Sequence, residues 1–472
     1  MDYQTSLNAP RVNDFKGFQE KAREIGDKIL ELEDPLIIHH YDCDGLASGG
    51  LVCLGRRIVG KQFKRLAVKN VRDEQIALLP ESKAYVFVDL GSSYAKALRT
   101  GLKGEIIVID HHPPVKEEGV EQLNPHFYGI DGSTDCSAST AAAFCFKHLN
   151  NEKIYQLGIV GAVGDMQDSR QEGFVGLNKL LANEAEEKGK VLIKKDLRLF
   201  GKISRPLTQF LTFCTEPILP GLTGKAKKCA AFLENNNIPL KKDEKWLTYY
   251  DLEEEDKKTF VSALINYALE KKVPEKLVKQ MVGFVYYFPW EEARILKEAS
   301  EFSTLLNACG RHGKDEAGIN ACLHEGELKD AEATLLIHRK QISMGLSFAQ
   351  DNTMDLGAFY FLDARNSIND TVIGSIAGAF LGSGAVTANK PIIAFSFDEE
   401  GNTKASSRGN SELVSKGLDL GKVMNIAGSS VNGIGGGHKP AAGCVFKTSK
   451  ENDEAFLKKA REEIKTQLNS SS

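Results

Sequence analysis

Aspartate and histidine residues gather at the ends of four apolar segments near the start of the chain. In order, these are His40-Tyr41-Asp42-Cys43-Asp44-Gly45, then Asp89, then Asp110-His111-His112, and finally Asp165. Carboxylate oxygens and imidazole nitrogens are good ligands for divalent cations, and Mn²⁺ accepts imidazole more readily than Mg²⁺. These residue types therefore predict a site for two divalent cations and the hydrolysis of a phosphoester bond.

The spacing of the first motif supports a shared site. His40, Asp42 and Asp44 alternate along the chain, so in an extended or tightly turned segment they can face one cavity. Asp89 ends another apolar run, and a carboxylate there could bridge two cations lying ~3.5–4 Å apart. His111 could complete the shell of the second cation with Asp44 and Asp165.

Each motif also has a simpler explanation. A single Asp after a strand caps the following helix more often than it binds a metal ion. The segment from Asp42 to Gly45 could be a turn, and the pair His111-His112 could be satisfied by hydrogen bonds. Four such motifs within the first 165 residues are improbable as independent caps, which favours the metal site.

The elements that would position these residues read as alternating strands and helices. Apolar runs predict strands near residues 35–39, 63–68, 84–88 and 105–109, and helical periodicity fills most of the intervals. This order predicts an α/β fold in which helices cover both faces of a parallel sheet. Ligands of such open sheets bind beyond the carboxyl ends of the strands, where most of the acids fall.

The remainder of the chain predicts three further parts. After a catalytic domain at 1–188, residues 189–295 read as a helical insertion, either a solvated decoration or a partner-binding module. Connecting helices follow at 296–345. Residues 346–472 predict a smaller α/β domain, with a glycine-rich loop at 435–437 before its last strand.

These motifs resemble those of a known family. The four acidic motifs are similar to the signature motifs of the DHH phosphoesterase superfamily, and Gly435-Gly436-Gly437-His438 resembles the GGGH motif of the accompanying DHHA1 domain. The resemblance covers about residues 35 to 446. The segment Leu306 to Arg311 is similar to RecJ-type exonucleases, and the whole chain looks most like archaeal RecJ-like proteins.

The resemblance implies a division of the ligands between two cations. His40, Asp42 and Asp89 would hold one, while Asp44, Asp89, His111 and Asp165 would hold the other. Asp110 and His112 would act catalytically, next to the ligands and on the scissile phosphate. Bacterial RecJ proteins usually have an acid at the position of His40, and here we expect Mn²⁺ rather than Mg²⁺.

The second domain supplies the expected substrate-binding residues. The segment Lys404-Ala405-Ser406-Ser407-Arg408 resembles the Ser-x-Arg strand of DHHA1 domains, in which the guanidinium clamps a phosphate, so Ser407 and Arg408 are candidates. Gly436, Gly437 and His438 could present backbone amides and an imidazole to an anion. Arg311 is a further candidate, although it could simply end a helix with a favourable charge.

The family resemblance implies a two-metal exonuclease with its active site in a cleft between the domains. It would digest single-stranded DNA or RNA, 5′ to 3′, to nucleoside 5′-monophosphates. One alternative is a nano-RNase or cyclic-dinucleotide phosphodiesterase on the same pair of domains. Another is a subunit of a replication or RNA-decay protein assembly, because some RecJ relatives have lost catalysis.

Bulk composition restricts the class of protein. A chain of 472 residues predicts two or three domains. The net charge of −4 argues against coating nucleic acid through bulk electrostatics. The nine cysteines include no C-x-x-C pair, which predicts reduced thiols in a cytoplasmic protein. No run of about 18 apolar residues predicts a membrane span.

Overall fold

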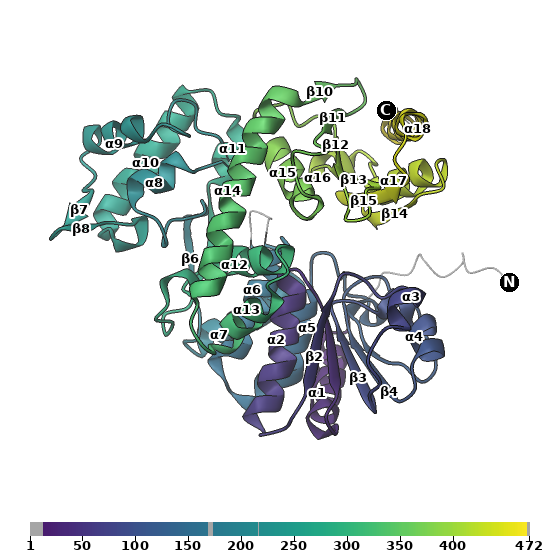
Figure 1. The fold of residues 1–472 in the computed structure, drawn as a ribbon. Coiled ribbons are helices and arrows are strands. Elements are labelled where there is room, and N and C mark those ends of the chain that lie inside the picture. The colour runs from purple at the N-terminus through teal and green to yellow at the C-terminus, as the bar shows by residue number, and fades with distance from the viewer. Residues whose placement is uncertain (1–12, 169–172, 216, 470–472) are drawn as a thin grey trace. The chain divides into compact units, whose positions relative to one another are not determined.

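A five-stranded parallel sheet forms the core of the first part of the chain in the computed structural model, which describes residues 13–168, 173–215 and 217–469 (Figure 1). The strand order is β2-β1-β3-β4-β5, and every neighbouring pair is parallel. The predicted α/β fold class is confirmed. The strands are β1 (Leu36–His40), β2 (Lys64–Val68), β3 (Ala84–Val88), β4 (Glu105–Ile109) and β5 (Glu121–Leu123).

Helices cover both faces of this sheet because alternate strand residues point to opposite sides. Val86 and Val88 pack with α1 (Phe15–Glu31), α2 (Cys43–Ile58) and α5 (Ala138–Phe146) in one apolar cluster. Tyr85 and Phe87 pack on the other face, near α3 (Asp73–Ile76) and α4 (Ala95–Gly101). Burial on both faces explains why β3 and β4 read as apolar runs.

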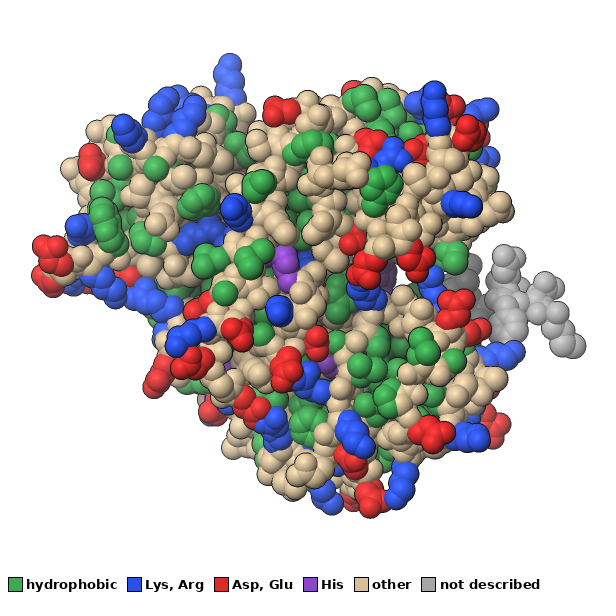
Figure 2. All heavy atoms as spheres, viewed as in Figure 1, with side chains coloured by type: hydrophobic (Ala, Val, Ile, Leu, Met, Phe, Trp, Pro, Cys, Tyr) green, Lys and Arg blue, Asp and Glu red, His purple; other side chains and the backbone are tan. Residues whose placement is uncertain are grey.

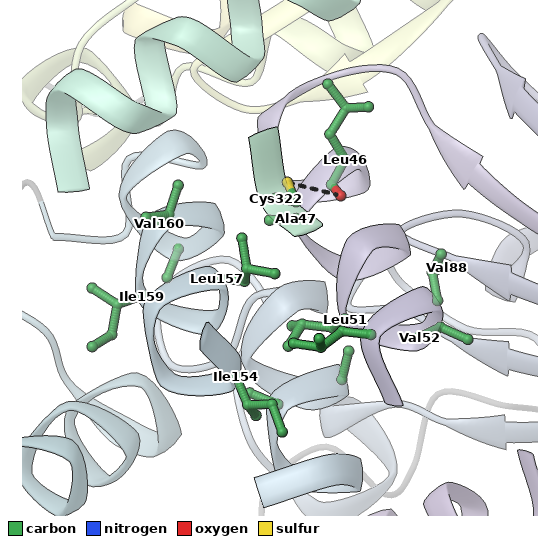
Figure 3. Close-up of a cluster of buried hydrophobic side chains, with 14 of the residues drawn as sticks. Leu46, Ala47, Leu51, Val52, Val88, Ile154, Leu157, Ile159, Val160 and Cys322 are labelled. Carbon is green, nitrogen blue, oxygen red and sulfur yellow. Dashed lines mark hydrogen bonds between the residues drawn. The ribbon is translucent and has the colours of Figure 1, made fainter. Parts of the chain in front are cut away.

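Helix α2 lies between the sheet and α6 (Glu152–Gly164), as Figure 3 shows. Leu51 and Val52 belong to one apolar cluster with Val88 of the sheet and Leu157 of α6. Two helices from later in the chain, α12 (Ala299–Arg311) and α13 (Asp315–Leu323), also contact α2 and α6. The helix that begins at the first acidic motif is therefore fixed on several sides.

The chain divides into two compact units. The first comprises the residues up to Ser204 together with Val282–Leu335, and the second comprises Arg205–Met281 and Leu336–Ser472. The domain limits expected from the sequence stay predictions. The helices of the expected insertion lie between β6 (Leu192–Leu197) and β9 (Val282–Tyr287), two antiparallel strands in which Leu197 pairs with Val282.

The remaining elements of the first unit are short or connect its helices. They are η1 (Ser92–Tyr94), η2 (Pro125–Tyr128), η3 (Lys147–Leu149), α7 (Gly176–Glu187), η5 (Arg294–Leu296) and the first residues of α14 (Lys329–Asn352). Between β6 and β9 lie α8 (Leu207–Thr212), α9 (Ala226–Asn235), β7 (Lys241–Lys242), β8 (Lys245–Trp246), η4 (Tyr249–Asp251), α10 (Glu254–Glu270) and α11 (Glu275–Gln280).

A mixed six-stranded sheet organises the rest of the second unit, in the order β10-β11-β12-β13-β15-β14. Its strands are β10 (Met354–Asp355), β11 (Tyr360–Asp363), β12 (Ile392–Phe397), β13 (Thr403–Arg408), β14 (Ile434–His438) and β15 (Ala441–Phe446). Helix α15 (Asp370–Gly382) packs on one face, while α17 (Leu420–Ser429) and α18 (Lys450–Asn469) pack on the other. The short α16 (Ser411–Ser415) precedes α17.

The glycine-rich segment corrects one expectation. Residues 435–437 were predicted as a loop, but they form the middle of β14, the edge strand that pairs with β15. Glycine has a low intrinsic preference for strands, so the backbone pairing with β15 is what determines this structure.

The surface shown in Figure 2 carries acidic and basic side chains interspersed with one another. This agrees with the small net charge of the chain, −4. Among the described residues, no helix combines the length and the apolar character needed to cross a membrane.

Candidate metal centre

The predicted ligands lie where the connections of the parallel sheet diverge. From β1 the chain continues to β2 on one side, whereas from β3 it continues to β4 on the other. In open α/β sheets, a ligand-binding crevice forms at the carboxyl ends of two such strands. His40 is the last residue of β1, and Asp89 directly follows β3.

The first ligand cluster consists of His40, Asp42 and Asp89, whose potential ligand atoms lie within 4.8 Å of one another. Nδ1 of His40 is 3.1 Å from Oδ2 of Asp42 and 3.3 Å from Oδ2 of Asp89. Burial opposes protonation of His40, but the interactions with the carboxylates of Asp42 and Asp89 together outweigh it and raise the pKa of His40 well above its usual value. A cation bound here would displace that proton.

The second ligand cluster consists of Asp44, His111 and Asp165, again within 4.8 Å of one another. Nδ1 of His111 donates to the carbonyl oxygen of Gly132 at 2.7 Å, since a carbonyl can only accept. In a neutral imidazole this leaves Nε2 with a lone pair for a cation. Nδ1 of His111 also lies 3.8 Å from Oδ2 of Asp165.

Asp44 is anchored by the amino terminus of α5. Its Oδ2 accepts from the backbone N–H of Ala138 at 2.7 Å, and its Oδ1 from that of Ser139 at 3.0 Å. Amides at a helix start favour a negative charge. Even so, burial raises the pKa of Asp44 to about 7, and the nearby carboxylate of Asp89 adds to the increase. A cation would offset this unfavourable charge.

Asp89 lies between the two clusters. Its Oδ2 faces His40, and its Oδ1 is 3.3 Å from Nε2 of His111. Its backbone has φ of 61°, a left-handed conformation that is uncommon for residues other than glycine. Such conformations concentrate at functional sites. The orientation of the two oxygens suits the bridging role predicted from the sequence.

Both carboxylate oxygens of Asp110 accept hydrogen bonds from neighbouring residues. Its Oδ2 accepts from the N–H of Ser92, while its Oδ1 accepts from the N–H groups of His111 and His112 and from Nδ1 of His112. Burial opposes its ionisation, but the imidazole of His112 holds the pKa of Asp110 below the usual range. Asp110 thus orients both histidines.

The potential ligand atoms, and the hydrogen bonds that they lack, test whether divalent cations fit the two clusters. Within the part of the chain that the structure describes, Nδ1 of His40 and Oδ1 of Asp89 are buried and have no hydrogen-bond partner. Buried polar atoms are normally satisfied, so a missing partner requires an explanation. Oxygen and imidazole ligands around these atoms fit Mn²⁺ or Mg²⁺.

Local structure explains why the first motif reaches this position. Asp42 caps α2 by accepting from the N–H of Gly45 at 3.0 Å. A Cβ atom at Gly45 would lie 2.5 Å from the carbonyl oxygen of His40, so only glycine allows the helix to start so close to β1. The helix cap, which was the simpler explanation for Asp42, is therefore present, and the role of Asp42 as a ligand stays a prediction.

Two of the expected substrate-binding residues occupy the same register position on different strands and lie on one face of the second sheet. Arg408 of β13 pairs with Ala441 of β15, and Ala441 pairs with His438 of β14. Residues directly opposite in neighbouring strands point to the same face. This is the face covered by α15, where the guanidinium of Arg408 passes close to Gly374.

The other expected substrate-binding residues are placed differently. The Ser407 side chain is buried on the opposite face, and its hydroxyl donates to the carbonyl of Ala442 at 3.0 Å. Gly436 and Gly437 lie in β14 beside His438. Arg311 is the last residue of α12 in the first unit. Their roles in binding stay predictions.

Sequence reasoning missed the residues that hold the ligands in place. Gln167 donates to Asp165, Asn178 donates to Gln167, and Asn307 accepts from the N–H of Cys43. Only Asn307 had a signal, because it lies in the RecJ-like segment. The other two have ordinary amide side chains whose importance depends on folded contacts.

Comparisons with known proteins agree with this geometry. Residues 199–282 match the DHH-CID domain model, and residues 357–466 match the DHHA1 domain model. The chain is 30% identical to the uncharacterized protein MJ0831 of Methanocaldococcus jannaschii, over 96% of this chain and 99% of that protein.

Solved structures of other proteins also share the fold. CDC45 from Entamoeba histolytica superimposes with a TM-score of 0.63 at 13% identity, over 95% of this chain and 98% of its own. RecJ from Thermus thermophilus in complex with Mn²⁺ has a TM-score of 0.54 at 16% identity, over 98% of this chain and 56% of its own.

These matches define the class of protein by two family domains, DHH-CID and DHHA1. The chain belongs to the DHH/DHHA1 superfamily, and it shares its fold with RecJ.

Proposed function

We propose that this protein is a two-metal exonuclease that hydrolyses single-stranded DNA or RNA, from the 5′ end, to nucleoside 5′-monophosphates. The observation that carries the proposal is the pair of ligand clusters with Asp89 between them. In this proposal His40, Asp42 and Asp89 hold one cation, while Asp44, Asp89, His111 and Asp165 hold the other.

Two divalent cations, Mn²⁺ in preference to Mg²⁺, would supply a nucleophilic water at neutral pH and positive charge for the phosphate oxygens. The protein's own contribution is to keep the ligands in place. Asp44 is held by two helix amides and His111 by the Gly132 carbonyl. Preorganised ligands of this kind need little rearrangement during reaction.

His112 is proposed to act on the scissile phosphate. Its Nδ1 contacts Oδ1 of Asp110 at 2.8 Å. Burial lowers the pKa of His112, but the charge of Asp110 and this hydrogen bond together outweigh burial and raise it. A protonated imidazole oriented in this way can donate to a phosphate oxygen or to a leaving oxygen. Asp110 is then a positioning residue, and His112 is the catalytic one.

Arg408 and His438 are proposed to bind a substrate phosphate. They occupy the same register position on two strands of the second sheet, and Ala441 of the strand between them pairs with both. A planar guanidinium can hold two phosphate oxygens at once. Such contacts read the backbone and not the bases, so the proposed specificity for single strands would not depend on sequence.

A polarity-resolved digestion tests the proposal. Purified protein with Mn²⁺ should release mononucleotides from single-stranded oligonucleotides, with label lost first from the 5′ end, and Asp42→Ala should not. Asp27→Ala, at a half-exposed position of α1, is the matched control and should retain activity. Full activity of Asp42→Ala would contradict the metal assignment. DNA and RNA substrates in parallel determine the preference.

Substrate length separates the proposal from its nearest alternative. An exonuclease should degrade an oligonucleotide of roughly 30 nucleotides efficiently, because a longer strand offers more backbone contacts. A nano-RNase or cyclic-dinucleotide phosphodiesterase should instead prefer a dinucleotide. Faster turnover of the dinucleotide would replace the proposed substrate and leave the phosphoesterase assignment unchanged.

A further inference from the structure

A chain of buried amide side chains lies behind the second ligand cluster. Nε2 of Gln167 donates to Oδ2 of Asp165 at 2.8 Å and to the carbonyl oxygen of Gly132 at 2.9 Å. Nδ2 of Asn178, in α7, donates to Oε1 of Gln167 at 2.6 Å. Gln167 is 4% exposed and Asn178 only 1%.

The orientation of each amide follows from its partners. The Asp165 carboxylate and the Gly132 carbonyl can only accept, so the atom of Gln167 that faces them must be its NH₂ group. The carbonyl oxygen of Gln167 must then face a donor, which Asn178 provides. Oδ1 of Asn178 in turn accepts from the N–H of Ser137 at 3.3 Å.

These contacts reach all three members of the second cluster. Asp165 is bound directly by Gln167, and His111 shares the Gly132 carbonyl with Gln167. Asp44 is reached through Ser137, the residue that caps α5 and precedes the two amides that hold the Asp44 carboxylate. In the first cluster, by contrast, Asp42 is held by the N–H of Gly45.

We propose that Gln167 and Asn178 are positioning residues for the second cation, which set the geometry of Asp44, His111 and Asp165 together. The inference rests on the proposed metal centre. Partners of metal ligands fix the ligand's tautomer and orientation, and their loss typically weakens metal binding by about 10-fold to 100-fold. The effect should fall on the second cation and spare the first.

Titration of the whole protein with Mn²⁺ by calorimetry tests this without any nuclease assay. Asp165→Asn should lose one of the two binding steps and so identify the second cation. Gln167→Met keeps the length of the side chain but removes its hydrogen bonds. It should weaken that same step by about 10-fold or more and leave the other step unchanged.

Asn178→Asp provides a second variant of nearly unchanged size. Its carboxylate can only accept, so the NH₂ group of Gln167 should turn toward it, and the Gln167 oxygen would then face Asp165. The second step should weaken as in Gln167→Met. This variant decides the question if Gln167→Met does not fold.

Gln156→Met is the matched control. Gln156 is a fully buried amide of the same unit, and its Nε2 donates to the Leu296 carbonyl at 3.2 Å. It should lower the melting temperature without altering either Mn²⁺ step. Equal weakening of both steps in Gln167→Met and Asn178→Asp, or no weakening, would overturn the inference.

Failure of the proposed function would look different. Selective loss of the second Mn²⁺ step, in a protein that cuts no oligonucleotide, would reject the exonuclease and uphold the positioning role. Wild-type protein that binds no Mn²⁺ would reject both.

Discussion

At the scale of single residues, the candidate ligands also stabilise the helices beside them. Asp42 caps α2, and Asp44 accepts from two amides at the start of α5. Substitution of either residue therefore changes two things, the candidate metal site and the helix end. Variants that separate these effects are more informative than alanine alone.

Asp42→Asn and Asp42→Ala should differ in stability but not in metal binding. Asparagine retains an oxygen that can accept from the N–H of Gly45, whereas alanine has none. Asp42→Ala should therefore be less stable than Asp42→Asn by about 1 kcal/mol. Urea unfolding in the presence of a chelator measures the difference. Equal stabilities would show that the cap contributes nothing here.

Residue spacing predicted the candidate ligands because acids and histidines at strand ends have a recognisable pattern. The structure brings together His40, Asp42, Asp44, Asp89, His111 and Asp165. Gln167 and Asn178 could not be predicted in this way, because the contacts that show their role, such as those with the Gly132 carbonyl and the Ser137 N–H, form only in the fold. Ser407 has the right neighbours in sequence, but strand alternation turns its side chain into the core.

At the scale of elements, two glycines of α15 leave space for the side chain of Arg408. A Cβ atom at Gly374 would clash with Nη2 of Arg408, whereas one at Gly378 would be 3.6 Å from its Cγ, an ordinary contact. The two glycines are one helical turn apart, so both face the strand that carries Arg408.

Gly374→Ala should weaken binding of a single-stranded oligonucleotide, because the added methyl group displaces the guanidinium. Gly378→Ala is the matched control. It should bind normally and be more stable by up to about 1 kcal/mol, since alanine is the better helix former. Fluorescence anisotropy with a labelled oligonucleotide measures the binding. Normal affinity of Gly374→Ala would argue against a phosphate role for Arg408.

Helix α7 is joined to its neighbours through Glu184. This carboxylate accepts from Lys147 at 2.7 Å, from Lys188 at 2.8 Å and from the Tyr155 hydroxyl at 2.9 Å. Burial opposes its charge, but the hydrogen bonds from the lysines outweigh it and lower the pKa of Glu184 to about 2.

Glu184→Gln should destabilise the protein at neutral pH but not in strong acid. A lowered folded-state pKa contributes stability that is present above the unfolded value of about 4.5 and is lost as pH falls toward 2. Because the side chain is partly exposed, screening limits the effect to about 1 kcal/mol at pH 7. Unfolding free energies from pH 7 to pH 3 should therefore converge, and a constant difference would contradict this origin.

Four strands of the first sheet, β1 to β4, were predictable, because they read as short apolar runs between helical patterns. Strand β14 was not, since three consecutive glycines carry no strand signal. Its structure comes from the pairing of its backbone with β15, and side-chain patterns cannot report such pairing.

At the scale of the whole molecule, the chain passes between its two compact units three times. The boundaries fall after Ser204, Met281 and Leu335. The sequence predicted an insertion at residues 189–295, and its limits stay a prediction. The two units themselves are defined by contacts between segments that are distant in the sequence. No single cut in the chain would separate them, so their stabilities must be compared in the intact protein.

Thermal unfolding should show two transitions, and Mn²⁺ should raise only one of them. All six candidate ligands belong to the first unit, and a ligand stabilises only the part that binds it. At free Mn²⁺ of about 100 times the dissociation constant, the stabilisation is about 2.7 kcal/mol. Differential scanning calorimetry with and without Mn²⁺ measures both transitions. A single transition that Mn²⁺ raises as a whole would instead indicate that the units unfold together.

The anchoring of Asp42 and Asp44 has a further consequence for the cost of binding a cation. The amides of α2 and α5 already restrict these carboxylates, so their conformational entropy is lost during folding and not at the moment of binding. The apoprotein should therefore keep its secondary structure in a chelator, unlike small domains that fold only around a metal ion. Removal and return of the cation should then be reversible without any refolding step.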